Sequence, residues 1–252
     1  MKKDVAAKVR VAIPEPCSYD LEYSGRALPP YLRAIEVAGG QPVIIPLKSS
    51  PEEIARLITS CAAVLLPGSK ADVDPQKYGA EKAMETAPAD EPRDAADELL
   101  LQDAYNLRKP VFGICYGLQS LNVWRSGTLV QHINSSVNHN AGARVEVAHK
   151  VSVAAASLLA DQVLSGQNTA SVPVNSSHHQ SADVVGDGLR AVARCPEDGV
   201  IEALEGTVPG HYVLAVQWHP ERTFEQDPAS RRLFQAFVDS GRQWSESQST
   251  KT

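Results

Sequence analysis

The sequence predicts a three-layer α/β/α sandwich built on a mostly parallel central sheet. Short apolar runs alternate with segments of helical composition along most of the chain, and these runs are continuous rather than alternating in polarity. Continuous apolar strands are typical of a parallel sheet that helices cover on both faces. The length of 252 residues fits one large domain of this class.

The expected elements follow one another in strand–helix order. The apolar runs predict strands over 9–13, 42–46, 62–66, 111–114 and 213–217. Composition predicts helices over 28–39, 52–60, 93–108, 117–125 and 228–239. Pro51, Pro92 and Pro228 stand at or near the start of three of these helices, where a residue without an N–H is tolerated.

The stretch from about 130 to 205 has a different texture, with polar residues and short β-rich pieces over 169–174, 189–193 and 200–203. We expect these pieces to extend the same sheet in antiparallel fashion. No long linker or fixed-period repeat separates them from the rest, so a second domain is the weaker interpretation. The sequence therefore predicts one domain over residues 8–240, followed by a polar tail over 241–252.

The composition excludes several classes of protein. Apolar residues make up 43% and charged residues 21% of the chain, which is typical of a folded globular protein. The formal net charge of −6 provides no overall positive field for nucleic acid. The start lacks the apolar core of a secretion signal, and no apolar run is long enough to span a membrane, so we expect a cytoplasmic protein.

The strongest chemical signal is the segment Gly113-Ile-Cys-Tyr-Gly117, which follows a buried-type strand and precedes a helix. This is the pattern of a nucleophile elbow with cysteine in the nucleophile position. The glycines let a sharp turn close, and the helix N-terminus favours the thiolate of Cys115. A buried structural cysteine beside a tight turn is the alternative, and the pattern by itself leaves it open.

A base for such a nucleophile stands after the last apolar run, in the segment Gln217-Trp-His-Pro-Glu221. His219 and Glu221 are two residues apart, so an extended backbone places both side chains on one side. The carboxylate of Glu221 can then orient the imidazole of His219. Together with Cys115 these residues predict a Cys-His-Glu catalytic triad.

The remaining cysteines and histidines give no metal-binding pattern. Cys17, Cys61 and Cys195 form no C-x-x-C pair and no zinc-type cluster with histidine. The spacings of His132, His139, His149 and His211 do not converge on a ligand set either. The sequence therefore predicts neither a metal site nor a cofactor.

Taken together, these segments resemble the class I glutamine amidotransferase-like hydrolases, and within them the peptidase C26 group. The resemblance covers roughly residues 8–240 and also includes the segments 66–69, 72–75, 78–79, 127–129, 174–180 and 198–202. Asn175-Ser-Ser-His-His-Gln180 is most similar to bacterial γ-glutamyl-γ-aminobutyrate hydrolases. The resemblance implies a flavodoxin-like fold and hydrolysis of a γ-glutamyl amide through a thioester.

The resemblance also implies roles for individual residues. Cys115 would be the nucleophile, His219 the base and then the acid, and Glu221 the residue that orients the imidazole. The backbone N–H of Tyr116 would form an oxyanion hole with an N–H from the loop that contains Gly68 and Ser69.

Gln119 and His178 would contact the substrate. For both, a purely structural role stays open, since Gln119 can simply pack and His178 can be satisfied by backbone groups. Glycine at position 68 can likewise be a plain turn residue.

Two positions depart from the pattern of the resembling hydrolases. Tyr116 stands where they commonly have arginine, and Ser126 stands where many have glycine. Because of these departures, the identity of the amine that the reaction would release stays open. Two other functions also stay open: a glutaminase subunit that delivers ammonia to a separate synthase, and a non-catalytic binding protein on the same scaffold. The expected partner is a small γ-glutamyl substrate, and a homodimer is left open.

Overall fold

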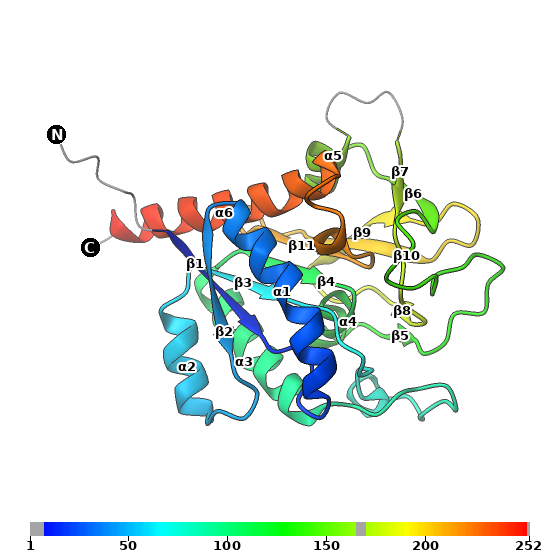
Figure 1. The fold of residues 1–252 in the computed structure, drawn as a ribbon, viewed down its shortest axis with the longest axis horizontal. Helices are drawn as coiled ribbons and strands as arrows, with labels where there is room; N and C mark the ends of the chain where they lie inside the picture. The colour runs from blue at the N-terminus through cyan, green and yellow to red at the C-terminus, as the bar shows by residue number, and fades with distance from the viewer. Residues whose placement is uncertain (1–7, 165–169, 251–252) are drawn as a thin grey trace.

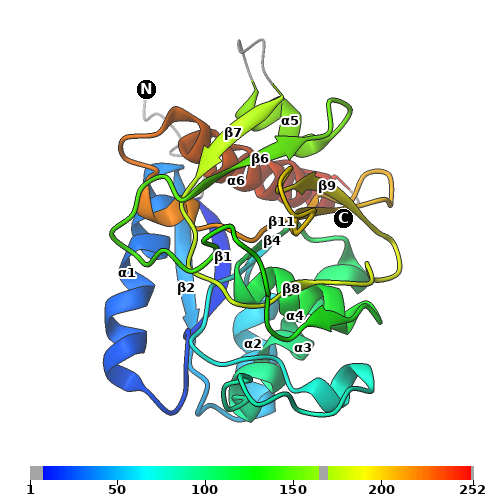
Figure 2. The same ribbon diagram turned by 90° about the vertical axis from the view of Figure 1, so that its right-hand side faces the viewer.

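A central sheet runs through the molecule (Figures 1 and 2). The structure is a computed structural model that describes residues 8–164 and 170–250. Within these residues the main sheet has nine strands, in the spatial order β2 (Gly40–Ile45), β1 (Val9–Pro14), β3 (Ala63–Leu66), β4 (Val111–Ile114), β11 (Val213–Val216), β10 (Ile201–Gly206), β9 (Leu189–Arg194), β6 (His149–Val153) and β7 (Ser171–Val174).

The sheet has a parallel half and an antiparallel half. Neighbours from β2 to β11 pair in parallel. Neighbours from β11 to β7 pair in antiparallel fashion, which confirms the predicted extension of the sheet. Of the predicted piece 169–174, residue 169 lies outside the described residues.

Helices cover both faces of the sheet, as the α/β/α prediction requires (Figure 2). One face packs against α1 (Leu21–Val37), α5 (Leu158–Val163) and α6 (Pro228–Ser249). The other packs against α2 (Pro51–Thr59), α3 (Glu91–Leu107) and α4 (Tyr116–Trp124). Each face therefore has its own apolar core, and the fully buried strands between them are apolar on both sides.

Helix starts follow the local signals in the sequence. Ser50 caps α2 in a capping box with Glu53, and Pro51 is the first residue of the helix. Asp227 caps α6 by accepting hydrogen bonds from two backbone N–H groups, and Pro228 follows it. The helix starts that these two prolines predicted are thus confirmed.

Two helices are longer than the sequence predicts. α1 begins at Leu21 rather than near residue 28, so Pro29 and Pro30 lie inside it. α6 continues to Ser249 instead of ending near 239, so its last turns take up most of the expected polar tail. Trp244 fixes this end of α6, because its indole N–H donates to the carbonyl of Leu107 at 2.8 Å. Tertiary packing outweighs the local composition in both cases.

The antiparallel half was predicted least completely. Within this half, β6 and the helix α5 were not predicted. Elsewhere, the separate two-stranded sheet of β5 (Leu129–Val130) and β8 (Ser181–Ala182) was not predicted, nor were the 3₁₀ turns η1 (Pro75–Tyr78) and η2 (Pro220–Arg222). Ser126 has a φ of 68°, in the left-handed region where glycine is favoured.

No helix within residues 8–164 and 170–250 has the length and apolar character needed to cross a bilayer.

Candidate active site

Cys115 occupies the sharp turn between β4 and α4. Its backbone has φ 55° and ψ −105°, which L-residues rarely adopt. A Cβ on Gly117 would lie 2.2 Å from the carbonyl oxygen of Leu66, and one on Gly113 would lie 2.8 Å from the carbonyl oxygen of Gly117. Both glycines are therefore needed for the turn to close.

The end of β11 holds the next two residues of the site. β11 pairs in parallel with β4, and the N–H of Cys115 donates to the carbonyl of Val216 at 2.8 Å. Beyond β11, His219 precedes η2 and Glu221 lies within it. Oε1 of Glu221 lies 2.7 Å from Nδ1 of His219. The carboxylate accepts this hydrogen bond, so Nδ1 carries the proton.

Cys115 and His219 meet at the end of β3, the strand on the other side of β4. A Cβ placed on Gly68 would lie 3.1 Å from Cε1 of His219 and 3.7 Å from Cβ of Cys115. Nε2 of His219 is buried and makes no hydrogen bond, and the Cys115 thiol is close enough to interact with the ring. One ring nitrogen is thus bound to Glu221 while the other is free beside the thiol.

The neighbours of His219 determine its charge. Burial opposes protonation of the ring, but the charges of Glu221 and Cys115 favour it more strongly, and the pKa of His219 rises to about 9. Arg222 acts against this rise. Burial also opposes ionisation of Glu221, yet the imidazolium outweighs it and lowers the pKa of that carboxyl. Near neutral pH the pair is therefore an imidazolium and a carboxylate.

The peptide group between Pro67 and Gly68 is held at both ends. Its carbonyl oxygen accepts a hydrogen bond from Nη2 of Arg93 at 2.7 Å, and its N–H donates to the hydroxyl of Tyr31 at 3.1 Å. Arg93 is 0% and Tyr31 is 2% exposed. These contacts fix the orientation of the peptide, and the N–H of Gly68 is occupied by Tyr31.

The backbone of Tyr116 belongs to the elbow, and its side chain contacts residues of α3. It is the first residue of α4, so its N–H has no acceptor within the helix. Its hydroxyl contacts Oδ1 of Asp94 at 2.5 Å, and the guanidinium of Arg93 lies 4.9 Å from its ring centroid. The hydroxyl of Ser69, in the neighbouring loop, accepts from the N–H of Ala71 at 3.0 Å.

The pattern of the peptidase C26 family matches residues 18–221, most of the chain. The chain belongs to the peptidase C26 family. It is 34% identical to a γ-glutamyl-γ-aminobutyrate hydrolase of Escherichia coli strain K12 over 219 residues, which cover 82% of this chain and 83% of that protein. It is 40% identical to a candidate glutamine amidotransferase of Mycobacterium tuberculosis over 214 residues, which cover 83% of this chain and 65% of that protein.

Solved structures agree with this assignment at the level of the fold. A protein from Thermoplasma acidophilum, described as a candidate component of GMP synthase, matches with a TM-score of 0.68 at 14% identity, over 96% of this chain and 98% of that one. The predicted flavodoxin-like α/β fold is confirmed, and membership of the peptidase C26 family supports a hydrolase.

The two predicted substrate contacts are buried in this peptidase C26 chain. Nε2 of Gln119 donates to the carbonyl of Gln180 at 3.2 Å and to Oε1 of Gln217 at 3.3 Å. Nδ1 of His178 donates to the same Gln180 carbonyl at 2.9 Å. Burial lowers the pKa of His178 to about 4. Contact of these residues with a substrate stays a prediction, and Gln180 fixes both of them.

Sequence reasoning did not single out three residues that hold the backbone of the site. The side-chain amide of Asn175 is hydrogen-bonded to the backbone N–H and carbonyl of His219. This residue had a signal, because it stands in the 174–180 segment that carried the resemblance. Tyr31 and Arg93 had none, since they lie in α1 and α3 far from any motif. Their importance depends entirely on which backbone groups they contact.

Proposed function

We propose that this chain is a cysteine hydrolase that cleaves a γ-glutamyl amide of a small amine, with γ-glutamyl-γ-aminobutyrate as the first candidate. One observation carries the proposal: Cys115 lies beside His219, whose Nδ1 is bound to Glu221 and whose Nε2 is unpaired. A thiol, an imidazole and a carboxylate in this order form the general arrangement of an activated cysteine nucleophile.

In the first half of the proposed reaction, the thiolate of Cys115 attacks the γ-carbonyl carbon and forms a C–S bond. The carbonyl electron pair moves to oxygen. When this tetrahedral intermediate collapses, the C–N bond breaks and the imidazolium of His219 gives its Nε2 proton to the departing amine. The products of this half are the free amine and a γ-glutamyl thioester on Cys115.

In the second half, water replaces the amine. Neutral His219 takes a proton from the water through Nε2 while the water oxygen attacks the thioester carbon. Collapse of the second tetrahedral intermediate breaks the C–S bond, and it releases glutamate, the thiolate and the imidazolium. Glu221 keeps the ring in one tautomer throughout, and the scheme uses no cofactor.

We assign stabilisation of the oxyanion to the N–H of Tyr116 and to an N–H of the Gly68–Ser69 loop. If Gly68 is the second donor, the substrate oxygen takes the place of the Tyr31 hydroxyl, which accepts that N–H at 3.1 Å in the free protein. Each donor of this kind contributes about 3 kcal/mol to transition-state stabilisation.

The choice of a γ-glutamyl amine rests on the relatives. A hydrolase named for γ-glutamyl-γ-aminobutyrate shares 34% identity over 82% of this chain. The segments 174–180 and 198–202 carried the same resemblance.

The test is glutamate release from a panel of γ-glutamyl amides by the purified chain with no other protein present. We expect γ-glutamyl-γ-aminobutyrate to be hydrolysed faster than glutamine. Cys115→Ala should abolish turnover, whereas Cys61→Ala, which alters a buried cysteine bonded to the backbone of α2, should retain it. A Cys115→Ala variant with full activity would refute the mechanism.

The relative named as a candidate glutamine amidotransferase supports one rival, a glutaminase subunit. That rival uses the same three residues but passes ammonia to a synthase. Glutamine turnover that appears only when a second protein is added, with γ-glutamyl amines untouched, would favour the subunit over the free-standing hydrolase.

A further inference from the structure

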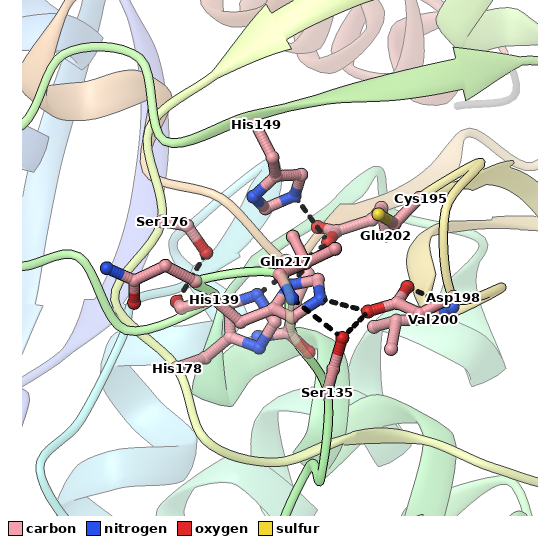
Figure 3. Close-up of polar contacts among 12 residues, drawn as sticks. Ser135, His139, His149, Ser176, His178, Cys195, Asp198, Val200, Glu202 and Gln217 are labelled. Atoms are coloured by element: carbon pink, nitrogen blue, oxygen red, sulfur yellow. Dashed lines mark hydrogen bonds and ion pairs between the residues drawn. The ribbon is translucent and has the colours of Figure 1, made fainter.

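Three histidine rings gather around the carboxylate of Glu202, in a cluster that lies outside the Cys115, His219 and Glu221 triad (Figure 3). Oε1 of Glu202 lies 2.8 Å from Nε2 of His149, 3.2 Å from Nδ1 of His139 and 3.8 Å from Nε2 of His178. All four side chains are at most 4% exposed. We call these four residues the His–Glu cluster.

The frame of the His–Glu cluster is rigid. His149 belongs to β6 and Glu202 to β10, two strands of the main sheet. His139 and His178 lie in loops that are joined to each other, since the N–H of His178 donates to the carbonyl of His139 at 3.0 Å. Sites on strands and mutually bonded loops hold their donor atoms more precisely than isolated loops do.

Hydrogen bonds on the outer side of two rings determine which nitrogen faces inward. Nε2 of His139 lies 2.8 Å from Oδ2 of Asp198, and Nδ1 of His178 donates to the carbonyl of Gln180 at 2.9 Å. Since a carboxylate and a carbonyl only accept, these outer nitrogens carry protons. In a neutral ring the inward nitrogen then has a free lone pair. An outer N–H that donates to a carboxylate or a carbonyl is the usual second contact of a metal-bound histidine.

Nε2 of His149 is hydrogen-bonded to Oε1 of Glu202 at 2.8 Å, but the other inward atoms lack hydrogen-bond partners. Nδ1 of His139, Nε2 of His178 and Oε2 of Glu202 are all buried, and none of them makes a hydrogen bond. Nδ1 of His139 is within ion-pair distance of Glu202 but is not aligned to donate to it. Buried polar atoms without a partner are unfavourable, and a cation bound between the nitrogens and the carboxylate would give them one.

We propose that His139, His149 and Glu202 bind one divalent transition-metal ion of the zinc type. One potential ligand atom from each of the first three residues lies within 4.8 Å of the other two. Zinc is bound by imidazole nitrogen and carboxylate oxygen, and a site with three protein ligands leaves the fourth position to water, so this donor set suits it.

A second possible donor group, formed by His139, Cys195 and Asp198, is less suited. There Nε2 of His139 is already bonded to Asp198, and the Cys195 thiol donates to Glu197 at 3.1 Å. A surface cavity of about 260 Å³ is lined by Ser135 and Asp198, and Asp198 is the residue bonded to the outer nitrogen of His139.

A bound ion would strengthen the support of the active-site histidine. Ser176 donates through its hydroxyl to the carbonyl of His139 at 2.5 Å. The adjacent residue, Asn175, bonds the backbone of His219 on both sides. The metal would therefore anchor the loop that positions His219 without taking part in the reaction.

The experiment uses the full chain without an affinity tag, stripped of metal with a chelator and titrated with zinc chloride against a chromophoric chelator. We expect one zinc ion per chain and a higher Tm in the zinc-bound protein. His149→Asn should bind zinc at least about tenfold more weakly. His132→Asn, at an exposed histidine outside the His–Glu cluster, should bind it as tightly as the wild type.

Stripped wild-type protein that takes up no zinc and shows no change in Tm would overturn the proposal, whatever the variants do. Zinc binding of wild-type strength in a folded His149→Asn variant would overturn it too, because the metal would then lie elsewhere. If that variant does not fold by circular dichroism, His139→Asn takes its place with the same two outcomes. Neither result depends on hydrolase activity, so the proposed function can fail separately.

Discussion

The side-chain amide of Asn175 brackets the backbone of His219. Oδ1 of Asn175 accepts from the N–H of His219, and Nδ2 donates to its carbonyl, both at 2.8 Å. Each residue is 4% exposed. The two bonds fix the backbone of His219 on either side of its ring, so the position of the imidazole beside Cys115 depends on a loop far away in the sequence.

Replacing Asn175 by aspartate should reduce activity by displacing His219. Asn175→Asp puts a carboxylate oxygen against the carbonyl of His219 and removes one donor. We expect kcat for the γ-glutamyl substrate to fall by about 100-fold with little change in KM, since small misplacements of a catalytic group have costs of this size. Asn134→Asp, at an exposed position, is the matched control. A rise in KM alone would speak against a positioning role.

Gly68→Ala should have an effect of similar size through steric crowding. The new methyl group would lie 3.0 Å from the Tyr31 hydroxyl and 3.1 Å from Cε1 of His219, so the ring must move. We expect a loss of about 100-fold in kcat/KM. Gly25→Ala is the control, because a Cβ there meets nothing within 4 Å and alanine favours the helix. Wild-type kinetics in Gly68→Ala would contradict the proposed place of the substrate.

The pH dependence of the reaction should reflect the raised pKa of His219. The imidazolium donates the proton to the leaving amine, so kcat/KM should decline as the pH rises through about 9. Glu221→Gln removes a carboxylate that raises this pKa, while burial still lowers it. The alkaline limb should therefore shift to lower pH. Glu225→Gln, at an exposed carboxylate, should leave the profile in place.

The raised pKa of His219 also determines how the stability of the fold depends on pH. The ring titrates near its ordinary value of 6.5 when the chain is unfolded and near 9 when it is folded. The stabilisation from this pair is therefore complete below about pH 6.5 and is lost as the pH rises through about 9. Urea unfolding at a series of pH values measures it, and an equal pH dependence in Glu221→Gln would contradict the assignment.

Arg93→Met should destabilise the fold strongly. The guanidinium donates to Asp97 at 2.8 Å and to the carbonyls of Pro16 and Pro67, and both charged side chains are at most 1% exposed. Removing one partner of a buried pair costs about 3–5 kcal/mol because the other charge is left uncompensated. Arg26→Met breaks an exposed pair with Glu22 and should cost less than about 1 kcal/mol. Urea unfolding of both variants checks this, and equal losses would show that Asp97 finds another partner.

The sequence by itself determined the parallel half of the sheet and the elbow. The elbow depends on Gly113 and Gly117, which stand two residues either side of Cys115, so its geometry is encoded within one turn of chain. The pairing of His219 with Glu221 is local in the same way. The carboxyl ends of neighbouring parallel strands share one edge of the sheet, which is why two separate motifs could be expected to meet.

Tertiary structure alone decided the contacts that hold these groups in place. Arg93 and Tyr31 reach the Gly68 peptide from two different helices, and no local pattern in α1 or α3 indicates it. His149 reaches Glu202 only because β6 and β10 lie on either side of β9, a strand order set by long-range antiparallel pairing. The sequence lacks this information because a histidine has the same local signal whether its ring meets solvent or a buried carboxylate. Only the register of strands distant in the sequence distinguishes the two.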